Sequence, residues 1–548
     1  MEVIDSKQLD HHGLVAGVIS DLGLQALIDE RLLKNPKSKI STGQAVVAML
    51  VNSLGFTTRP LSLTPHFFES KAVNELFGND VKAEDFNRHR LGRSLDEIAD
   101  YGCDMLYAEL AQEVCRAERI SQDFLSLDTT SHTVTGRYDK DADENEVVIT
   151  HGYSKDHRPD LKQVVQELLV SQDGGIPLMS KSFDGNASDS EIFKVRCKEL
   201  LKQFQAAKSP SYLVADSKLY SSKNAENLKG LPFITRIPRT VKEENQAVKK
   251  ALESQSWTDL DEKNRYYLHT CEHFGMKQRW LVIYSQAAAD RAQKTLNKHV
   301  EKEAEKTRLK LKHLRNEPFK CEGDAHAALK KMNEALKYHQ LLKLEIIAKA
   351  HYSSKGRPKP KEEPSHFTYI ATAAAEVSQD KKKARLDAKS CYVIGTNVEE
   401  GKLSHTEIIE AYKKQNESIE RGFRFLKDPY FFTSSFFIKK PSRIMALLMI
   451  MTLALLVYSI AQRRLRKALK ESNEAIPNQI NQPSSKPTLR WVFQLLEGIS
   501  VVYVRIGNVV SRVITGLTKL KRKIIGLFSE KIQQIYGLDE NQQSGSGV

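Results

Sequence analysis

The sequence predicts a mixed α/β protein, and three features of the residue pattern lead to that prediction. From about residue 123, short apolar runs typical of β-strands, such as FLSLD and SYLVADSKLY, alternate with amphipathic helical segments. Apolar residues three and four positions apart, which indicate helices, dominate residues 1–120. Helical and basic sequence returns after residue 461. We therefore expect an α/β core that lies, along the chain, between a helical N-terminal domain and a helical C-terminal region.

The pattern divides the chain into five segments. Residues 1–120 read as a small helical domain with a core of its own, in which STGQ marks the start of a helix. Residues 121–239 form the first part of the core, with QDGG as a hairpin turn between two strands. Residues 240–402 interrupt the core with paired strands, a long charged helical stretch and the linker GRPKPKEEPS. Residues 403–470 supply the final core helices, and residues 471–548 form a basic helical region that ends in a disordered tail.

Composition narrows the range of functions. The 548 residues include 83 Lys and Arg against 69 Asp and Glu, which gives a formal charge of +14. Such an excess favours a polyanionic partner, nucleic acid first and an anionic membrane second. The six cysteines form no CxxC pair, which suits a reducing compartment, and the polar start of the chain shows no signal-peptide pattern. We therefore expect a cytoplasmic protein.

One apolar segment leaves a membrane location open. Residues 444–460, IMALLMIMTLALLVYSI, contain hardly a polar group, and Arg443 and Arg463 flank them. A stretch of this length is at the lower limit for a membrane span, and basic flanks suit one. A helix at the centre of a large core has the same pattern. We favour the core helix, because the rest of the chain reads as soluble, and keep the membrane span as the alternative.

Two aspartates follow apolar strands and are the first candidate catalytic residues. Asp128 ends FLSLD, and Asp216 ends the apolar run of SYLVAD. If the two strands are neighbours in one sheet, their carboxylates emerge together and repel unless a cation lies between them. Mg²⁺ suits such a site because it prefers carboxylate oxygens and leaves positions for phosphate oxygens. Two such ions about 4 Å apart support phosphoryl transfer, and a third carboxylate would complete the site.

The best third carboxylate is Glu420 in the helical segment SIERGFRFLKDP. Glu420 and Lys427 are seven residues apart, so they share one face of the helix, with Arg424 beside them. A carboxylate followed by basic residues on one face combines a metal ligand with phosphate-binding cations. Glu417, one turn earlier, is the nearest competing carboxylate.

These motifs in this order resemble the DDE transposases of bacterial insertion sequences, in the branch that carries a Y-R-E-K signature. The resemblance rests on DTTSH, ADSKLY and the E-x6-K helix, together with GYSKDHRPDLKQ, DGNASD and ERGFRFLKDP, and it extends over roughly residues 10–515. It implies a ribonuclease-H-like catalytic core interrupted by an insertion domain. It also implies that Asp128, Asp216 and Glu420 are the catalytic, metal-binding residues, and that two Mg²⁺ ions, or Mn²⁺, are the cofactors.

The chain departs from the signature of that branch at one place. Gln415 stands where the signature has Arg, and Glu420 follows Tyr412 by eight residues instead of seven. Glu420 and Lys427 keep the expected gap. We expect DNA contacts from two groups of polar residues, which are Tyr412, Arg424 and Lys427 on the helix and Lys155 and Arg158 in GYSKDHRPDLKQ.

The sequence therefore predicts a DNA transposase that cuts at the ends of its insertion sequence and joins the freed 3′-hydroxyl to target DNA. Its expected partner is double-stranded DNA, both terminal inverted repeats and target, with the helical N-terminal domain as a DNA-binding part. Because two ends must be joined, we expect a homodimer when the protein is bound to DNA. We expect it in the bacterial cytoplasm, associated with the nucleoid, and we do not expect it at the membrane. Two alternatives remain: a DNA-binding protein with an inactive site, and a membrane-anchored basic protein.

Overall fold

The computed structural model describes residues 2–32, 38–56, 60–138, 146–206, 211–353, 363–428 and 438–538. The predicted disordered tail lies largely outside these residues. The chain forms two compact units: unit 1 combines residues 1–235 with 407–548, and unit 2 is residues 236–406. Unit 1 is thus interrupted along the sequence by unit 2, at positions close to the 240–402 interruption expected from the residue pattern.

The sheet of unit 1 has the strand order β4–β3–β2–β5–β6. The bounds of these strands are β2 Phe124–Val134, β3 Lys162–Ser171, β4 Ile176–Phe183, β5 Tyr212–Ala215 and β6 Phe233–Arg236. β2, β3 and β4 are antiparallel, whereas β5 runs parallel to β2 and β6 parallel to β5. Three antiparallel strands followed by two parallel ones form the ribonuclease-H-like core, so the predicted mixed α/β class is confirmed.

Local sequence explains these strands and the elements between them. The QDGG turn joins β3 to β4, and Gly174 and Gly175 both adopt positive φ, as a tight hairpin requires. The connection from β4 to β5 is helix α8 (Asp189–Ala206), and the connection from β5 to β6 contains the short helices η3 (Ser222–Asn224) and α9 (Ala225–Leu228). Parallel strands cannot be joined by a tight turn, so they need a crossover connection, which is usually helical.

β2 extends further than the sequence suggested. The prediction that the strand ends at Asp128 was wrong, because β2 continues to Val134 through the polar residues of DTTSH. Each residue from Leu125 to Val134 pairs with a residue of β3. Thr129, Thr130 and Ser131 can remain in the strand because the neighbouring strand satisfies their backbone groups, and β-branched threonine suits the extended backbone. Asp128 therefore lies within a strand and not at its end.

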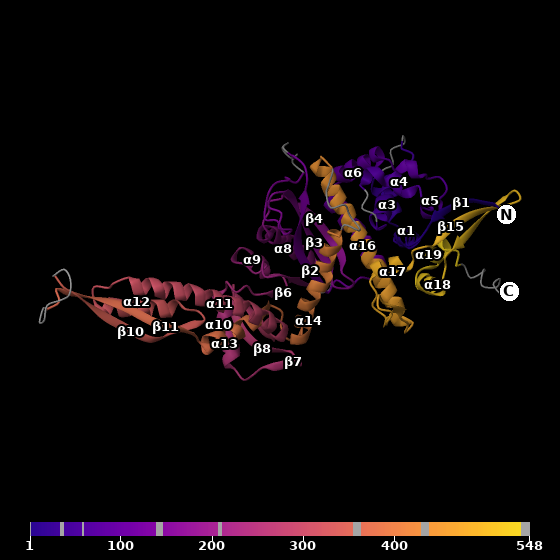
Figure 1. Ribbon diagram of the computed structural model, residues 1–548. Coiled ribbons are helices and arrows are strands. Elements are labelled where there is room, and N and C mark those ends of the chain that lie inside the picture. Colours follow the sequence, from indigo (N-terminus) through magenta and orange to yellow (C-terminus); the bar gives the residue numbers. More distant parts are fainter. Residues whose placement is uncertain are drawn as a thin grey trace. The chain divides into compact units, whose positions relative to one another are not determined.

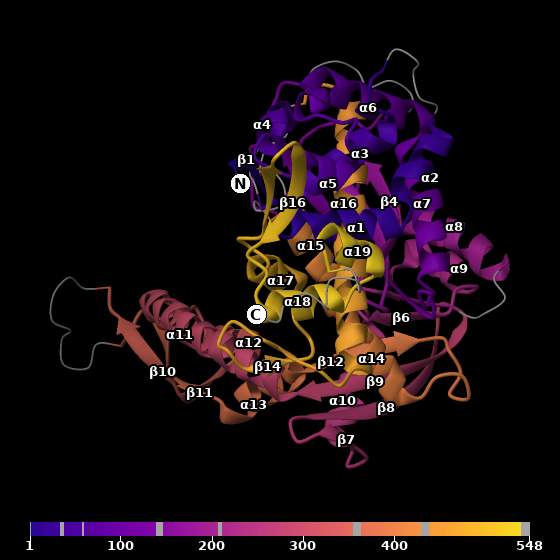
Figure 2. The same ribbon diagram turned by 90° about the vertical axis from the view of Figure 1, so that its right-hand side faces the viewer.

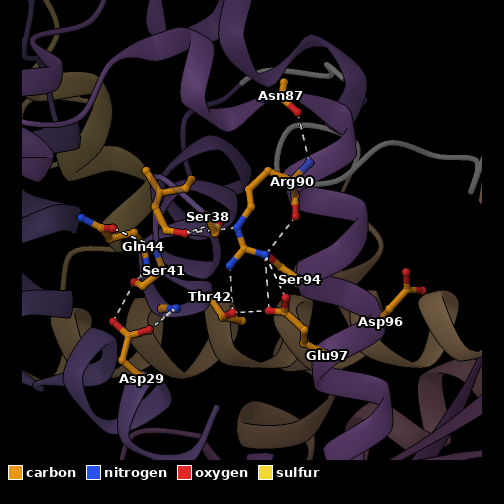
Figure 3. Close-up of polar contacts among 12 residues, drawn as sticks. Asp29, Ser38, Ser41, Thr42, Gln44, Asn87, Arg90, Ser94, Asp96 and Glu97 are labelled. Atoms are coloured by element: carbon orange, nitrogen blue, oxygen red, sulfur yellow. Dashed lines mark hydrogen bonds and ion pairs between the residues drawn. The ribbon is translucent and has the colours of Figure 1, made fainter. Parts of the chain in front are cut away.

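The N-terminal part of unit 1 is helical, as predicted. Its helices are α1 His12–Asp21, α2 Leu24–Arg31, α3 Thr42–Ser53, η1 Leu61–Leu63, α4 Thr64–Phe68, α5 Val73–Phe77, η2 Ala83–Phe86, α6 Arg88–Tyr101 and α7 Cys103–Ala117. Ser41 and Gln44 form a reciprocal capping box at the start of α3, which confirms the STGQ start signal. Figure 3 shows the buried Arg90 of α6, which donates to Thr42 at 2.9 Å and to Glu97 at 3.1 Å and so joins α6 to α3.

The long apolar segment forms α16 (Pro441–Glu471), the central helix of unit 1. Figure 1 shows α16 beside α6 and β4, and it also contacts α3 and α7. Among the described residues, α16 is the one helix long and apolar enough to cross a membrane, and 83% of its most apolar window is buried inside the protein. Its buried side chains belong to the main hydrophobic core together with residues from the N-terminal helices and the chain's end. This is the packing that the core-helix interpretation predicts.

Two predictions about the ends of the chain need correction. The N-terminal helices do not have a core of their own, because their buried residues form one cluster with α16 and the C-terminal elements. The C-terminal region is not helical alone: β15 (Ser500–Ile506) and β16 (Val509–Thr515) form a three-stranded sheet with β1 (Glu2–Gln8). The pairing of β1 with β15 joins residues nearly five hundred positions apart, which local periodicity does not reveal.

The remaining elements of unit 1 follow the interruption or lie near the C-terminus. They are α14 His405–Gln415, η4 Asn416–Glu420, α15 Arg421–Leu426, β13 Ile476–Pro477, β14 Pro483–Ser484, α17 Leu489–Leu495, α18 Lys519–Gly526 and α19 Glu530–Ile535. α19 closes against the N-terminus, where the Tyr536 hydroxyl donates to the Asp10 carbonyl at 2.5 Å and accepts from the Leu14 amide.

Unit 2 contains both strands and long helices. Its elements are α10 Lys242–Glu253, β7 Thr258–Asp261, β8 Asn264–His273, β9 Met276–Ser285, α11 Gln286–Asn316, α12 Glu322–Ala335, β10 His339–His351, β11 His366–Val377, α13 Gln379–Ser390 and β12 Cys391–Thr396. β10 and β11 form an antiparallel hairpin, which Figure 2 shows beside α11 and α12. A small separate core lies under this hairpin.

Candidate active site

Asp128 lies within β2, and Asp216 directly follows the neighbouring parallel strand β5. Leu127 of β2 pairs with Ala215 of β5, so the next residue along each strand is one of the two aspartates. Asp128 accepts a hydrogen bond from the Thr129 amide at 2.7 Å, and Asp216 accepts one from the Lys218 amide at 3.0 Å. The condition set by the sequence, that the two strands be neighbours, is therefore met.

The electrostatic environment of this pair favours the uncharged carboxyl. The pKa of Asp128 is raised to about 6, chiefly by burial and also by the charges of Asp216 and Asp189, against the opposing effect of Lys155. Burial also raises the pKa of Asp216, and the charge of Asp189 acts in the same direction. Neighbouring carboxylates that disfavour the ionisation of this pair make the place a site for positive charge.

Two lysines supply positive charge at this place, and Asp189 holds both. Asp189, the first residue of α8, forms an ion pair with Lys218, and its carboxylate lies 3.4 Å from the ammonium group of Lys155. Lys155 also donates to the Thr129 carbonyl at 2.6 Å and to the Thr129 hydroxyl at 2.7 Å. The hydroxyl of Thr129 in turn donates to Asp189. These contacts lower the pKa of Asp189 despite its burial.

Asp189 and Lys218 were not among the sequence-predicted site residues. Asp189 belongs to DGNASD, where helix capping was a sufficient explanation, and Lys218 belongs to ADSKLY, only two residues after Asp216. The signal that could have found Lys218 was its place directly behind a candidate catalytic aspartate. Nothing local distinguishes Asp189 from a capping residue, because its role depends on α8 beginning beside β2.

Glu420 lies on the helical segment that covers this part of the sheet. Ser418 of η4 approaches Ser126 of β2, with 3.3 Å between their hydroxyl oxygens. Four residues further along β2, Thr130 lines a shallow depression together with two residues of α15 and with Lys427 and Asp428, which follow that helix. Ser126, Asp128 and Thr130 share one face of the strand. Along the helical segment, Glu420 lies between Ser418 and the residues that line the depression. Along the strand, Asp128 lies between Ser126 and Thr130 in the same way.

The side chain of Glu420 is exposed, and no hydrogen bond or ion pair with another described residue holds it. Across the described ranges, no group of three His, Cys, Asp or Glu side chains is close enough to hold a metal ion. The structure thus brings Asp128 and Asp216 together and places Glu420 on the adjacent helix without joining it to them. The paired aspartates offer only oxygen donors and lack a full counter-charge, which fits a divalent cation such as Mg²⁺.

The helix carrying Glu420 contains a π-helical turn at η4. A π-turn accommodates one more residue than an α-turn. Glu420 follows Tyr412 by eight residues where seven were expected, and the extra residue falls in this turn. The buried face of α15 therefore continues the buried face of α14 despite the extra residue between them. The departure from the signature has a structural explanation, although Gln415 remains in the place of the expected arginine.

The residues predicted to contact DNA lie on or next to α14 and α15 and in the GYSKDHRPDLKQ loop. Lys427 bonds Asp156 of the GYSKDHRPDLKQ loop at 2.6 Å, which ties the loop to α15. Arg158 in that loop forms a two-pronged ion pair with Asp160 at 2.9 and 2.7 Å. Lys155, predicted to face DNA, points instead toward Thr129 and Asp189, as described above. Arg424 is exposed and Tyr412 is half-buried.

A family model described as Transposase DDE domain matches residues 120–457, more than half of the chain. The chain belongs to this family. The transposase domain runs from just before β2 to within α16, and so includes Asp128, Asp216 and Glu420 as well as unit 2. A second family model, described as a domain of unknown function (DUF4277), matches residues 4–112 of the transposase. This match coincides with the N-terminal helices.

Similarity of the transposase to individual proteins is slight. No curated protein sequence matches it. Among solved structures, it is similar to a chain in the cryo-EM structure of a piggyBac transposase synaptic complex with hairpin DNA, at 10% sequence identity and a TM-score of 0.37. The similarity covers 89% of this chain and 80% of that chain.

Proposed function

We propose that this transposase cuts DNA at the ends of its own insertion sequence and joins the freed 3′-hydroxyl to target DNA. The observation that carries the proposal is the pairing of Asp128 with Asp216 at one level of the sheet, in a domain of the Transposase DDE family. The net charge of +14 supports DNA as the partner. Joining two ends requires two copies of the site, so we propose a homodimer on DNA.

The residues of the chain have distinct roles in this proposal. Asp128 and Asp216, with Glu420, would hold divalent cations that activate the attacking oxygen and stabilise the leaving one. Arg424, exposed on α15, is available to a phosphate, and Lys427 beside it is held by Asp156 until DNA competes for its ammonium group. Lys155 and Lys218, which pair with Asp189, place positive charge beside the two aspartates before DNA and cations bind.

Strand cleavage with purified protein tests the proposal. The substrate is a labelled duplex carrying the inverted repeat that borders the gene, with Mg²⁺ or Mn²⁺. We expect cleavage at the repeat end by the unmodified protein, and a loss of about a thousandfold or more in Asp216→Asn. Asp100→Asn, an exposed residue of α6, is the matched control and should cut normally.

Two results would contradict the proposal. Equal cleavage by Asp216→Asn and the control would remove Asp216 from the catalytic site. Specific binding of the repeat without cleavage by the unmodified protein would instead favour the alternative of a DNA-binding protein with an inactive site.

A further inference from the structure

A second concave surface is lined in part by the helical segment that carries Glu420. It is a cleft of about 600 Å³ within unit 1. Four segments line it: the β3–β4 turn, the helical run from α14 to α15, the C-terminal half of α16, and residues 486–490. Glu420 itself is not in its lining. Apart from Arg424, the residues that line this surface, called the basic cleft below, have no role in the chemistry proposed above.

The basic cleft carries a large excess of positive charge. Six cationic side chains line it against two carboxylates, Glu417 and Asp428. Each carboxylate has a cationic partner in the cleft, since Glu417 lies 3.7 Å from Arg421 and Asp428 lies 2.7 Å from Arg490. The other four cations have no ion-pair partner among the described residues; they are Lys414, Arg424, Arg466 and Lys486. Four uncompensated cations in one concavity indicate an anionic ligand.

Arg466 shows that this charge is built into the fold and is not only a feature of mobile surface lysines. Arg466 is partly buried, and its side chain donates to the Pro487 carbonyl at 3.0 Å. Burial lowers its pKa, and the nearby charge of Arg421 lowers it further. The fold therefore fixes a guanidinium group in the cleft wall and leaves part of its donor capacity unused.

Two aromatic side chains are among the lining of the cleft, the buried Phe425 and the partly exposed Tyr458. Phe425 of α15 and Tyr458 of α16 lie with their ring centroids 4.8 Å apart, and both line the cleft. Gln172 also lines it, and the buried side-chain oxygen of Gln172 has no hydrogen-bond partner among the described residues. Positive grooves that contain aromatic rings are the usual binding surface for single-stranded nucleic acid, in which phosphates contact cations and bases contact rings.

The basic cleft is continuous with the candidate active site. Arg424 and Asp428 line both the cleft and the depression formed by Thr130 and Lys427 beside Asp128. A strand that lies over Asp128 can therefore cross α15 at Arg424 and enter the cleft without leaving positively charged surface.

We propose that the basic cleft binds one strand of DNA, a few nucleotides away from the phosphate that is cut. The inference rests on the proposed function, because it makes the cleft a subsite of the same active site. The cleft takes a separated strand and not duplex, because cations and the partly exposed ring of Tyr458 line it together, and a base can stack on such a ring only when it is unpaired.

Binding of an unstructured oligonucleotide tests the cleft directly. The full chain carrying Asp128→Asn is titrated with fluorescein-labelled dT8, over a range of salt concentrations. Lys414 and Lys486 are exposed and make no ion pair with described residues, so Lys414→Gln with Lys486→Gln should leave the fold intact. We expect this double variant to bind dT8 about tenfold more weakly, with a salt-dependence slope smaller by about 1.4.

The control changes the same charge elsewhere. Lys470→Gln with Lys531→Gln removes two exposed lysines outside the cleft and should leave dT8 binding unchanged. Equal weakening in the control, or unchanged binding in the cleft variant, would overturn the proposal. Weakened binding of duplex with unchanged binding of dT8 would overturn the assignment to a single strand.

The outcome separates the cleft from the proposed function. Because Asp128→Asn is present throughout, dT8 binding does not depend on catalysis. If the cleft variant loses dT8 binding while the unmodified protein does not cut the repeat end, the cleft proposal holds and the transposition proposal fails. If the protein cuts and the cleft variant binds dT8 normally, the reverse follows.

Discussion

At the scale of single residues, the carboxylate of Asp128 is in an unfavourable environment. It lies within a strand between buried neighbours, and its pKa is raised to about 6 chiefly by burial. The charged form of Asp128 therefore costs stability at neutral pH. Residues that cost stability are expected where function requires them, and this cost is a reason to regard Asp128 as more than a strand residue.

Replacing Asp128 should stabilise the protein in a pH-dependent way. An unperturbed aspartate has a pKa of 3.8 and Asp128 in the folded chain one of about 6, so unfolded protein loses this proton first as pH rises. Stability from this group is thus lost as pH rises from about 4 to about 6. Asp128→Asn cannot ionise, so in EDTA it should be more stable than the unmodified protein above about pH 7, by up to about 3 kcal/mol, with no gain at about pH 4.

Thermal melting in EDTA at about pH 4, 6 and 8 measures this difference. Asp100→Asn serves as the control, because Asp100 is exposed and its substitution should not shift the melting temperature at any of these values. A lower melting temperature for Asp128→Asn at the highest pH would show that its charged form is compensated in the fold.

At the scale of elements, the π-turn η4 makes a specific prediction about deletion. Asn416 is exposed, and η4 holds one residue more than an α-turn would. Deletion of Asn416 should convert the turn to α-helix while the faces of α14 and α15 stay aligned. We expect the deletion variant to keep its far-ultraviolet circular dichroism and to melt within a few degrees of the unmodified protein.

Deletion within an uninterrupted helix gives the contrast. Arg93 is exposed in α6, but its removal would rotate the buried Leu95 and Ile98 by about 100° away from the core. This variant should melt far lower or not fold. Similar destabilisation by the two deletions would mean that η4 is not an inserted residue accommodated by the helix.

The sequence predicted elements well where the pattern is local. The strands before Asp128 and Asp216, the QDGG hairpin, the Ser41 cap and the helix of Glu420 all follow from period, turn or cap signals. Prediction from the sequence failed for contacts between residues that are distant in the chain. β1 and β15 pair across nearly the whole chain, and Asp189 meets Lys155 only because of where α8 begins.

At the scale of the whole molecule, unit 1 depends on contacts that α16 makes with segments from the N-terminal half. Arg464 bonds Asp21 at 2.8 Å and Glu118 at 2.6 Å, and all three side chains are mostly buried. Removing one member of a buried ion network leaves the others uncompensated. Arg464→Met should therefore lower the melting temperature by several degrees, equivalent to about 2–4 kcal/mol.

The matched control lies on the same helix. Lys467 pairs with Glu471 at 3.8 Å, and both side chains are about two-thirds exposed. Exposed pairs of this kind contribute little, so Lys467→Met should melt close to the unmodified protein. Equal effects of the two substitutions would show that the Arg464 network does not join the N-terminal helices to α16.

The division of unit 1 along the sequence has a consequence for synthesis on the ribosome. The N-terminal helices emerge first, yet the helix that completes their core is encoded more than three hundred residues later, and β1 must wait for β15. Until then the apolar faces of the early helices have no partner and are exposed to chaperones and proteases. A message truncated before residue 441 would therefore yield an N-terminal fragment that does not fold stably.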